Sequence, residues 1–182
     1  MPAARLCPAI THSNNPHASR GFTLVELMVT VAVFAIVAAM AAPAMQAMVT
    51  SSRLNGATEE LVTALQLARS EAIRRNARVM VCSSADGATC SGSGDWSRWI
   101  VTGPDNAAGT VDIFRDQSAN AELRLSGPGA GIQFNPSGLI RAQQGLTVCA
   151  PSTDVSDNQR VISVLISGVV TYAKAGSGGV CS

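Results

Sequence analysis

The chain has 182 residues, 47% of them hydrophobic, and its 13 basic and 12 acidic residues give a net charge of +1 at pH 7. This length corresponds to about one small domain and excludes a multidomain enzyme. The two histidines, His12 and His17, lie near the N-terminus, so the remaining chain lacks the commonest general acid and base.

A long apolar segment follows a short basic one. Residues 1–21 contain Arg5 and Arg20 and no acid, whereas residues 27–52 contain no charged residue. A helix of that length, at about 1.5 Å per residue, can cross the roughly 30 Å hydrocarbon core of a membrane. The positive-inside rule then predicts a cytoplasmic N-terminus and an extracytoplasmic C-terminal part.

Two residues of the apolar segment need a physical explanation. Glu26 lies near its start, where an acid exposed to lipid is costly unless a cation is close. We therefore expect Glu26 to find a positive partner; the alternative is that it lies in the headgroup layer. Pro43 removes one backbone hydrogen bond and predicts a kink or local opening of the helix.

Beyond residue 52 the pattern becomes amphipathic, which predicts that the helix continues to about Asn76 and packs one face on a sheet. The apolar positions recur at three- and four-residue steps: Leu54, Ala57, Leu61, Leu65, Ala68 and Ala72. A basic cluster lies near the end of this helix and consists of Arg69, Arg74, Arg75 and Arg78. Cations there complement the helix macrodipole, and a phosphate-binding patch is the alternative.

The remaining sequence predicts an antiparallel β-sheet domain, because short apolar runs alternate with Gly, Pro, Ser and Asn. The predicted strands are 79–82, 99–102, 111–115, 122–125, 132–134, 146–149, 161–166 and 169–172. Asn135–Gly138 has turn chemistry, and Ser167–Gly168 suggests a tight hairpin. Trp96, Trp99 and Phe134 are expected in the core rather than on a base-stacking surface. The loop residues Asp86, Asp95 and Asp105 are interpreted as turn residues.

Four of the five cysteines follow the predicted membrane segment: Cys82, Cys90, Cys149 and Cys181. An oxidising compartment favours disulfides, and four cysteines allow three pairings. We favour Cys82 with Cys90, which closes a small loop, and Cys149 with Cys181, which holds the glycine-rich tail against a strand. Zinc is the alternative, but the chain has no C-x-x-C spacing, so we expect no metal. The sequence also lacks a phosphate-binding glycine loop and a nucleophile elbow, so we expect neither a cofactor nor an enzyme.

The stretch 21–45, the segment 67–76 and Val79–Cys82 together resemble the GspH/FimT group of type IV minor pilins and pseudopilins. Asp95–Trp96, Trp99–Val101 and Phe134–Gly138 continue the similarity through the β domain. The resemblance implies an α+β type IV pilin fold, in which a long N-terminal helix packs on an antiparallel β-sheet head. It implies a leader at 1–21, a hydrophobic transmembrane and assembly helix at 22–51, and a globular head at 52–182.

The resemblance also implies how the chain is processed and assembled. A prepilin peptidase would cut after Gly21 and methylate Phe22. Loss of Arg5 and Arg20 would leave 11 basic and 12 acidic residues, a net charge of −1. An inner-membrane assembly platform would move the subunit from membrane lipid into a filament. There Glu26 would pair with a neighbour's N-terminal amine, and Pro43 matches a proline common in pilin stems.

Within this group we favour a minor pilin that helps prime or cap the type IV pilus with other minor pilins and the major pilin. It would be a single-pass inner-membrane protein with a periplasmic head, and later part of a surface pilus. A DNA receptor is one alternative, with Lys174 and the Arg74, Arg75 and Arg78 cluster as contacts. DNA-binding members carry G-R-x-R where this chain has Gly168–Thr171, without either arginine. A GspH-type pseudopilin of type II secretion is the other alternative.

Overall fold

The computed structural model describes residues 21–105 and 108–181 and divides into two compact units, Met1–Met40 and Ala41–Ser182. One helix, α1 (Leu24–Arg75), runs through both units, and all strands belong to the second. The predicted continuation of the helix beyond residue 52 is therefore confirmed.

Helix α1 ends at Arg75, and the following Asn76 adopts a left-handed conformation with φ of 49°. The Asn76 N–H donates to the Ile73 carbonyl at 3.3 Å, and the Ala77 N–H donates to the Ala72 carbonyl at 3.2 Å. These two bonds are the Schellman motif, which satisfies carbonyls that a helix end leaves unpaired. The chain then turns directly into the first strand.

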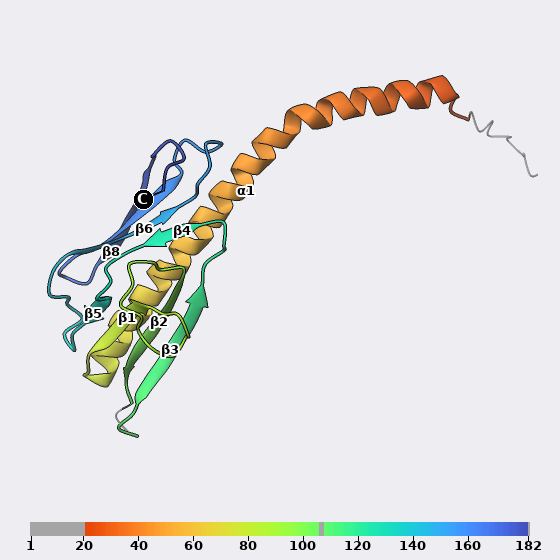
Figure 1. Cartoon of the computed structure of the whole chain (residues 1–182). Helices are drawn as coiled ribbons and strands as arrows, with labels where there is room; N and C mark the ends of the chain where they lie inside the picture. The colour runs from red at the N-terminus through yellow and green to blue at the C-terminus, as the bar shows by residue number, and fades with distance from the viewer. Residues whose placement is uncertain (1–20, 106–107, 182) are drawn as a thin grey trace, which may run out of the picture. The chain divides into compact units, whose positions relative to one another are not determined.

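The β domain consists of two four-stranded antiparallel sheets (Figure 1). The first has the order β3-β2-β1-β5, from β1 (Val79–Ser83), β2 (Arg98–Pro104), β3 (Val111–Ser118) and β5 (Ile132–Phe134). The second has the order β4-β6-β7-β8, from β4 (Arg124–Ser126), β6 (Gln144–Cys149), β7 (Gln159–Val164) and β8 (Val170–Ala175). The fold class and all eight predicted strands are confirmed.

The strand ends differ from the predictions where turns compete with strands. Strand β7 begins at Gln159 and ends at Val164, because the Leu165 N–H donates to the Val169 carbonyl and closes a hairpin turn. Gly168 occupies the left-handed position of that turn with φ of 74°. The division into two sheets was not predicted; the chain passes from β4 to β5 through Gly127–Pro128–Gly129.

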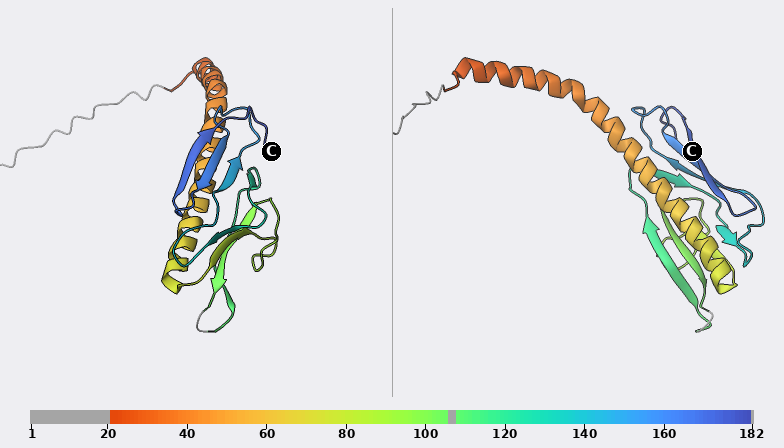
Figure 2. Two further views of the ribbon diagram at one scale, coloured as in Figure 1. Left: turned by 90° about the vertical axis from the view of Figure 1, so that its left-hand side faces the viewer. Right: turned by 180° about the vertical axis from the view of Figure 1, so that it is seen from behind.

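The C-terminal part of α1 packs on both sheets (Figure 2). All six predicted apolar positions of its second half are buried, as are Trp96, Trp99 and Phe134, so the predicted core is confirmed. The core also takes Val79 and Val81 from the first sheet and Leu146 and Ile162 from the second. One helix face therefore joins both sheets in a single core.

Two disulfides fasten the β domain. Cys82 bonds to Cys90 with a Cα–Cα distance of 5.6 Å, and Cys149 bonds to Cys181 at 5.8 Å. This is the pairing favoured from the sequence. Asn158, which is buried, accepts hydrogen bonds from the backbone N–H and the hydroxyl of Ser177 at 2.8 and 3.1 Å. The second disulfide thus holds a tail that also bonds to the loop before β7.

Candidate functional site

The residues expected to direct processing lie just before and within the first turn of α1. The Thr23 hydroxyl accepts a hydrogen bond from the Glu26 N–H at 3.2 Å, and the Thr23 carbonyl accepts one from the Leu27 N–H at 3.1 Å. Thr23 is therefore the N-cap, and Thr23-x-x-Glu26 has the sequence of a capping box. The carboxylate of Glu26 also lies at the positive end of the helix dipole. This local role of Glu26 was not predicted from the sequence.

Gly21 and Phe22 precede the helix and are exposed. A Cβ atom built on Gly21 meets nothing within 4 Å, so packing in this structure does not require glycine there. Residues 1–20 of the expected leader lie outside the described residues. The side chain of Pro43, which falls within α1, also lies outside them, and its effect on the helix stays a prediction.

The first unit presents apolar side chains on every side of α1. From Phe22 to Ala41 all described residues are exposed, including Phe34 at 75% and Met40 at 77%. By length and composition, α1 contains a segment that could cross a membrane. A helix that is hydrophobic all round is typical of burial in lipid or among other helices.

The basic cluster at the end of α1 is largely bonded within the head. Glu71 accepts hydrogen bonds from Arg74 at 2.5 Å and from Arg75 at 2.8 Å, and these bonds lower the pKa of Glu71. Arg75 also bonds to Asp112 at 3.3 Å and lies over the ring of Phe114, 4.1 Å from its centre. Arg75 therefore joins α1 to β3, and Arg74 pairs with Glu71 within α1.

Arg78 and Lys174 are exposed, the first after α1 and the second on β8. The segment expected to match the G-R-x-R motif, Ser167–Tyr172, spans the end of the hairpin turn and the start of β8 and contains no arginine. Nonspecific nucleic-acid binding depends on several contacts between cationic side chains and phosphates. The hairpin turn and β8 contain a single cationic residue, Lys174, which cannot make several such contacts.

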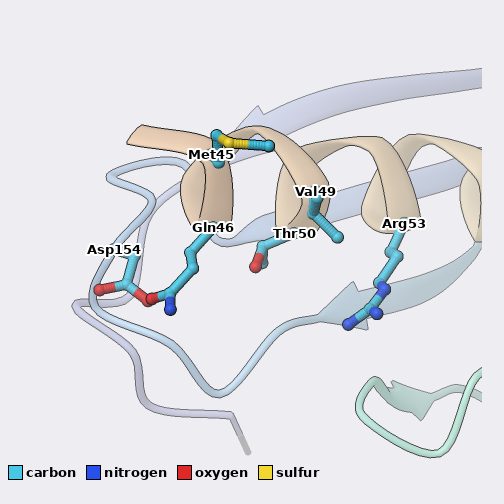
Figure 3. A pocket seen from close by; sticks show the side chains of 6 residues that line it. All are labelled: Met45, Gln46, Val49, Thr50, Arg53 and Asp154. Atoms are coloured by element: carbon cyan, nitrogen blue, oxygen red, sulfur yellow. The ribbon is translucent and has the colours of Figure 1, made fainter. Parts of the chain in front are cut away.

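A hollow of about 360 Å³ lies beside α1 in the second unit (Figure 3). Met45, Gln46, Val49, Thr50 and Arg53 line it from the helix, and Asp154 lines it from the loop before β7. Figure 3 shows Gln46 reaching toward Asp154. Arg53 forms an ion pair with Glu122. The lining combines apolar and polar side chains without a nucleophile–base pair, which suits contact rather than catalysis.

The loop closed by Cys82–Cys90 is ordered by Asp86. Its carboxylate accepts hydrogen bonds from the N–H groups of Ala88 and Thr89, both at 2.8 Å, and from the Thr89 hydroxyl at 2.8 Å. These bonds hold the pKa of Asp86 well below its usual range. The interpretation of Asp86 as a turn residue is confirmed.

Arg160 on β7 is a buried cation that sequence reasoning did not identify, with only 1% of its surface exposed. Its Nε donates to Oδ1 of Asn55 on α1 at 3.1 Å, and its Nη1 donates to the carbonyls of Asp157 at 2.7 Å and Gln159 at 2.9 Å. Nearby, the Tyr172 hydroxyl on β8 donates to Glu59 at 3.0 Å, and this carboxylate raises the pKa of Tyr172. These bonds join the second sheet to α1.

Comparisons with known proteins agree with these features. The family model described as type II transport protein GspH matches residues 57–169, and a prokaryotic N-terminal methylation motif matches residues 16–42. No curated protein sequence matches significantly.

Solved minor pilins and pseudopilins share the fold. FimU, a type IV minor pilin of Pseudomonas aeruginosa, is 22% identical with a TM-score of 0.53 over 70% of this chain and 96% of its own. EpsH, a minor pseudopilin of the type II secretion system of Vibrio cholerae, is 13% identical with a TM-score of 0.50 over 67% of this chain and 97% of its own. The resemblance noted from the sequence is confirmed, and the chain belongs to the GspH family of type IV minor pilins and pseudopilins.

Proposed function

We propose that this chain is a minor type IV pilin that helps to prime or cap pilus assembly, as a structural and interaction protein. The observation that carries the proposal is an apolar helix, exposed on all sides at its start, that continues into a disulfide-fastened pilin head. Such a helix needs lipid or neighbouring helices around it. The membrane would supply the lipid before assembly, and a filament of similar subunits would supply the neighbouring helices.

In this proposal a prepilin peptidase removes residues 1–21 and methylates Phe22. The match to the methylation motif supports this step, as does the open space around Gly21. Because the fold does not require glycine there, recognition by an enzyme is a better reason for it. Residues 22–51 then form the stem, and residues 52–182 form the head.

Glu26 is the proposed assembly residue. The stem would first hold the subunit in the inner membrane with its head in the periplasm. When the assembly platform moves the stem into the filament, the Glu26 carboxylate would pair with the N-terminal amine of a neighbouring subunit. An isolated charge in an apolar environment is costly, so this pairing would favour one register between stems.

Two alternatives keep the same fold and stem. In the first, the chain is a GspH-type pseudopilin of type II secretion, which the description of the matching family model supports. In the second, the chain binds DNA during natural transformation. The internal bonds of Arg74 and Arg75, and the valine and threonine in place of the arginines of G-R-x-R, argue against the second.

The experiment that tests the proposal is deletion of the gene in its native host, followed by quantification of surface pili released by shearing. We expect a large loss of pili that the wild-type gene restores. Normal piliation would refute the pilus role. A loss of protein secretion in the same strain would then favour the pseudopilin.

A further inference from the structure

Five apolar side chains are exposed on the part of the head where the end of α1 meets two turns. They are Ile73 on α1, Leu139 after β5, and Leu165, Ile166 and Val169 around the hairpin turn between β7 and β8. Their exposed fractions are 53%, 43%, 38%, 57% and 43%. We call this set the turn patch. Contiguous apolar side chains on a soluble surface are typical of an interaction site.

The turn patch is continuous because its two turns touch each other. The Ile140 N–H donates to the Ile166 carbonyl at 3.1 Å. A Cβ atom on Gly168 would lie 2.1 Å from the carbonyl oxygen of Gly138, and a Cβ atom on Gly138 would lie 2.8 Å from Cδ1 of Ile73. Glycine at both positions therefore permits a close approach that side chains would prevent.

Arg69 holds this arrangement against α1. Its Nη1 donates to the Gly168 carbonyl at 3.1 Å, and its side chain is half-buried. Both turns thus have a fixed position on the helix before any partner arrives. Such preorganisation lowers the entropy lost on binding.

A hollow of about 400 Å³ adjoins the turn patch. The lining from α1 is Gln66, Arg69, Ser70 and Ile73, and the lining from the hairpin turn and the start of β8 is Gly168, Val169 and Val170. Its size suits one or two apolar side chains of a partner, and anchors of this kind often dominate the binding energy of an interface.

The charges nearest in the chain to the turn patch are mainly positive. Arg69 lines the hollow, and the exposed Arg141 lies two positions after Leu139. The carboxylate closest to Ile73 in the chain, Glu71, is already paired with two arginines. The complementary partner surface is therefore apolar at its centre and acidic at its rim.

We propose that the turn patch is the surface through which this head docks on another pilin-family subunit, which inserts an apolar side chain into the hollow and places acidic residues beside Arg69 and Arg141. The proposal rests on the proposed function in requiring assembly with other pilins. It favours protein over nucleic acid, since the patch is apolar and Val169 stands where DNA-binding members carry an arginine.

The first test places a charge in the turn patch of the full chain, expressed in its native host in place of the wild type. Ile166→Asp is compared with Val111→Asp, a matched control on β3 whose valine is 74% exposed. We expect the Ile166 variant to fall about tenfold in the ratio of sheared filament to membrane pool, equivalent to about 1.4 kcal/mol, and the control to stay within about twofold. Equal ratios for both variants and the wild type would overturn the proposal.

The second test identifies the partner without relying on a destabilising variant. A photo-crosslinking amino acid replaces Ile166, or Val111 as the control, and the adducts from intact cells are identified by mass spectrometry. A pilin-family protein linked at position 166 alone supports the proposal; DNA, a protein of another family, or no adduct overturns it. Arg141→Glu should lower the adduct yield about threefold, because it would repel acidic residues of the partner. An unchanged yield would refute the proposal that the partner has acidic residues beside Arg141.

These outcomes are distinguishable from failure of the proposed function. If deletion of the gene abolishes pili but the Ile166 variant restores them fully, the turn patch is refuted and the pilus role stands. If deletion leaves pili intact but position 166 links to a pseudopilin, the pilus role is refuted and the turn patch stands.

Discussion

Replacing both Cys149 and Cys181 with alanine should destabilise the head more than replacing both Cys82 and Cys90. The Cys149–Cys181 bond links residues 32 apart in the sequence, and the Cys82–Cys90 bond links residues 8 apart. If each bond acts by restricting the unfolded chain, the loss of unfolding free energy is about 3.7 kcal/mol for the longer loop and about 2.5 kcal/mol for the shorter. The expected difference is thus about 1.2 kcal/mol.

Local contacts should increase this difference. The tail held by Cys181 donates two hydrogen bonds from Ser177 to Asn158, and the Gln159 side chain donates to the Val180 carbonyl at 3.3 Å. Without the disulfide these contacts must hold the tail alone. A partly frayed tail would leave Oδ1 of the buried Asn158 without the two hydrogen bonds from Ser177.

The assay is equilibrium unfolding in urea of a fragment of residues 46–182, followed by tryptophan fluorescence. The fragment retains the whole hydrophobic core, which begins at Leu54, and Trp96 and Trp99 are fully buried reporters. The control is the wild-type fragment with a reducing agent, which should match the variant lacking all four cysteines. A larger loss from the short loop than from the long one, or losses below about 0.5 kcal/mol for both, would refute the chain-entropy reasoning.

Four further predictions use the same fragment or the full chain. Gly168→Ala should lower the unfolding free energy in urea by about 3 kcal/mol, because the new Cβ would clash with the Gly138 carbonyl. Gly92→Ala, at a similar φ of 70° but with open space around it, should cost about 1 kcal/mol. Equal costs would show that the clash does not matter. Arg160→Ala should cost about 2–4 kcal/mol by the same measurement, because it removes three part-buried hydrogen bonds made by a side chain that is itself buried. A cost below about 1 kcal/mol would contradict that role. In the full chain, Glu26→Ala should leave processing intact, as the mass of the membrane-extracted variant would show, but reduce its recovery in sheared filaments. Normal recovery would count against the pairing with an N-terminal amine. Hydrogen bonds from Arg74 and Arg75 lower the pKa of Glu71 below 4.5, so the stability that the ionised carboxylate contributes is present above about pH 4.5 and is lost as the pH falls through the lowered pKa. Glu71→Gln should therefore show a smaller loss of unfolding free energy in acid than the wild type. An identical pH profile for the two would exclude this contribution of Glu71.

Local patterns in the sequence predicted most of the fold. The three- and four-residue spacing from Leu54 to Ala72 identified the buried face of α1, because a helix has only one face to place on a sheet. Short apolar runs between turn residues identified all eight strands, because such runs are typical of strands that bury one face. The division into two sheets could not be read in this way, since pairing such as β1 with β5 depends on contacts between segments far apart in the chain.

The sites were harder to predict than the fold. Arginine is usually found on the surface, so nothing in the sequence indicated that Arg160 is buried. Its burial follows from the packing of β7 on α1, where Arg160 bonds to Asn55. The glycines of the two turns were visible as turn signals, but contact between Gly138 and Gly168 depends on how both sheets pack on the helix. The capping box of Thr23 and Glu26 was present in the sequence and was overlooked, because the carboxylate was considered only as a charge in lipid.

The order of the cysteines along the chain has a consequence for biosynthesis. Cys82 and Cys90 are 8 residues apart and precede Cys149 and Cys181 in the chain, so a ribosome makes them first. The nearby pair can therefore be oxidised while the remaining chain is still growing, which removes two thiols from competition. When the last two cysteines arrive, each finds only the other as a free thiol within the head. If the nearby pair is oxidised first, the order of synthesis favours the observed pairing among the three possible ones.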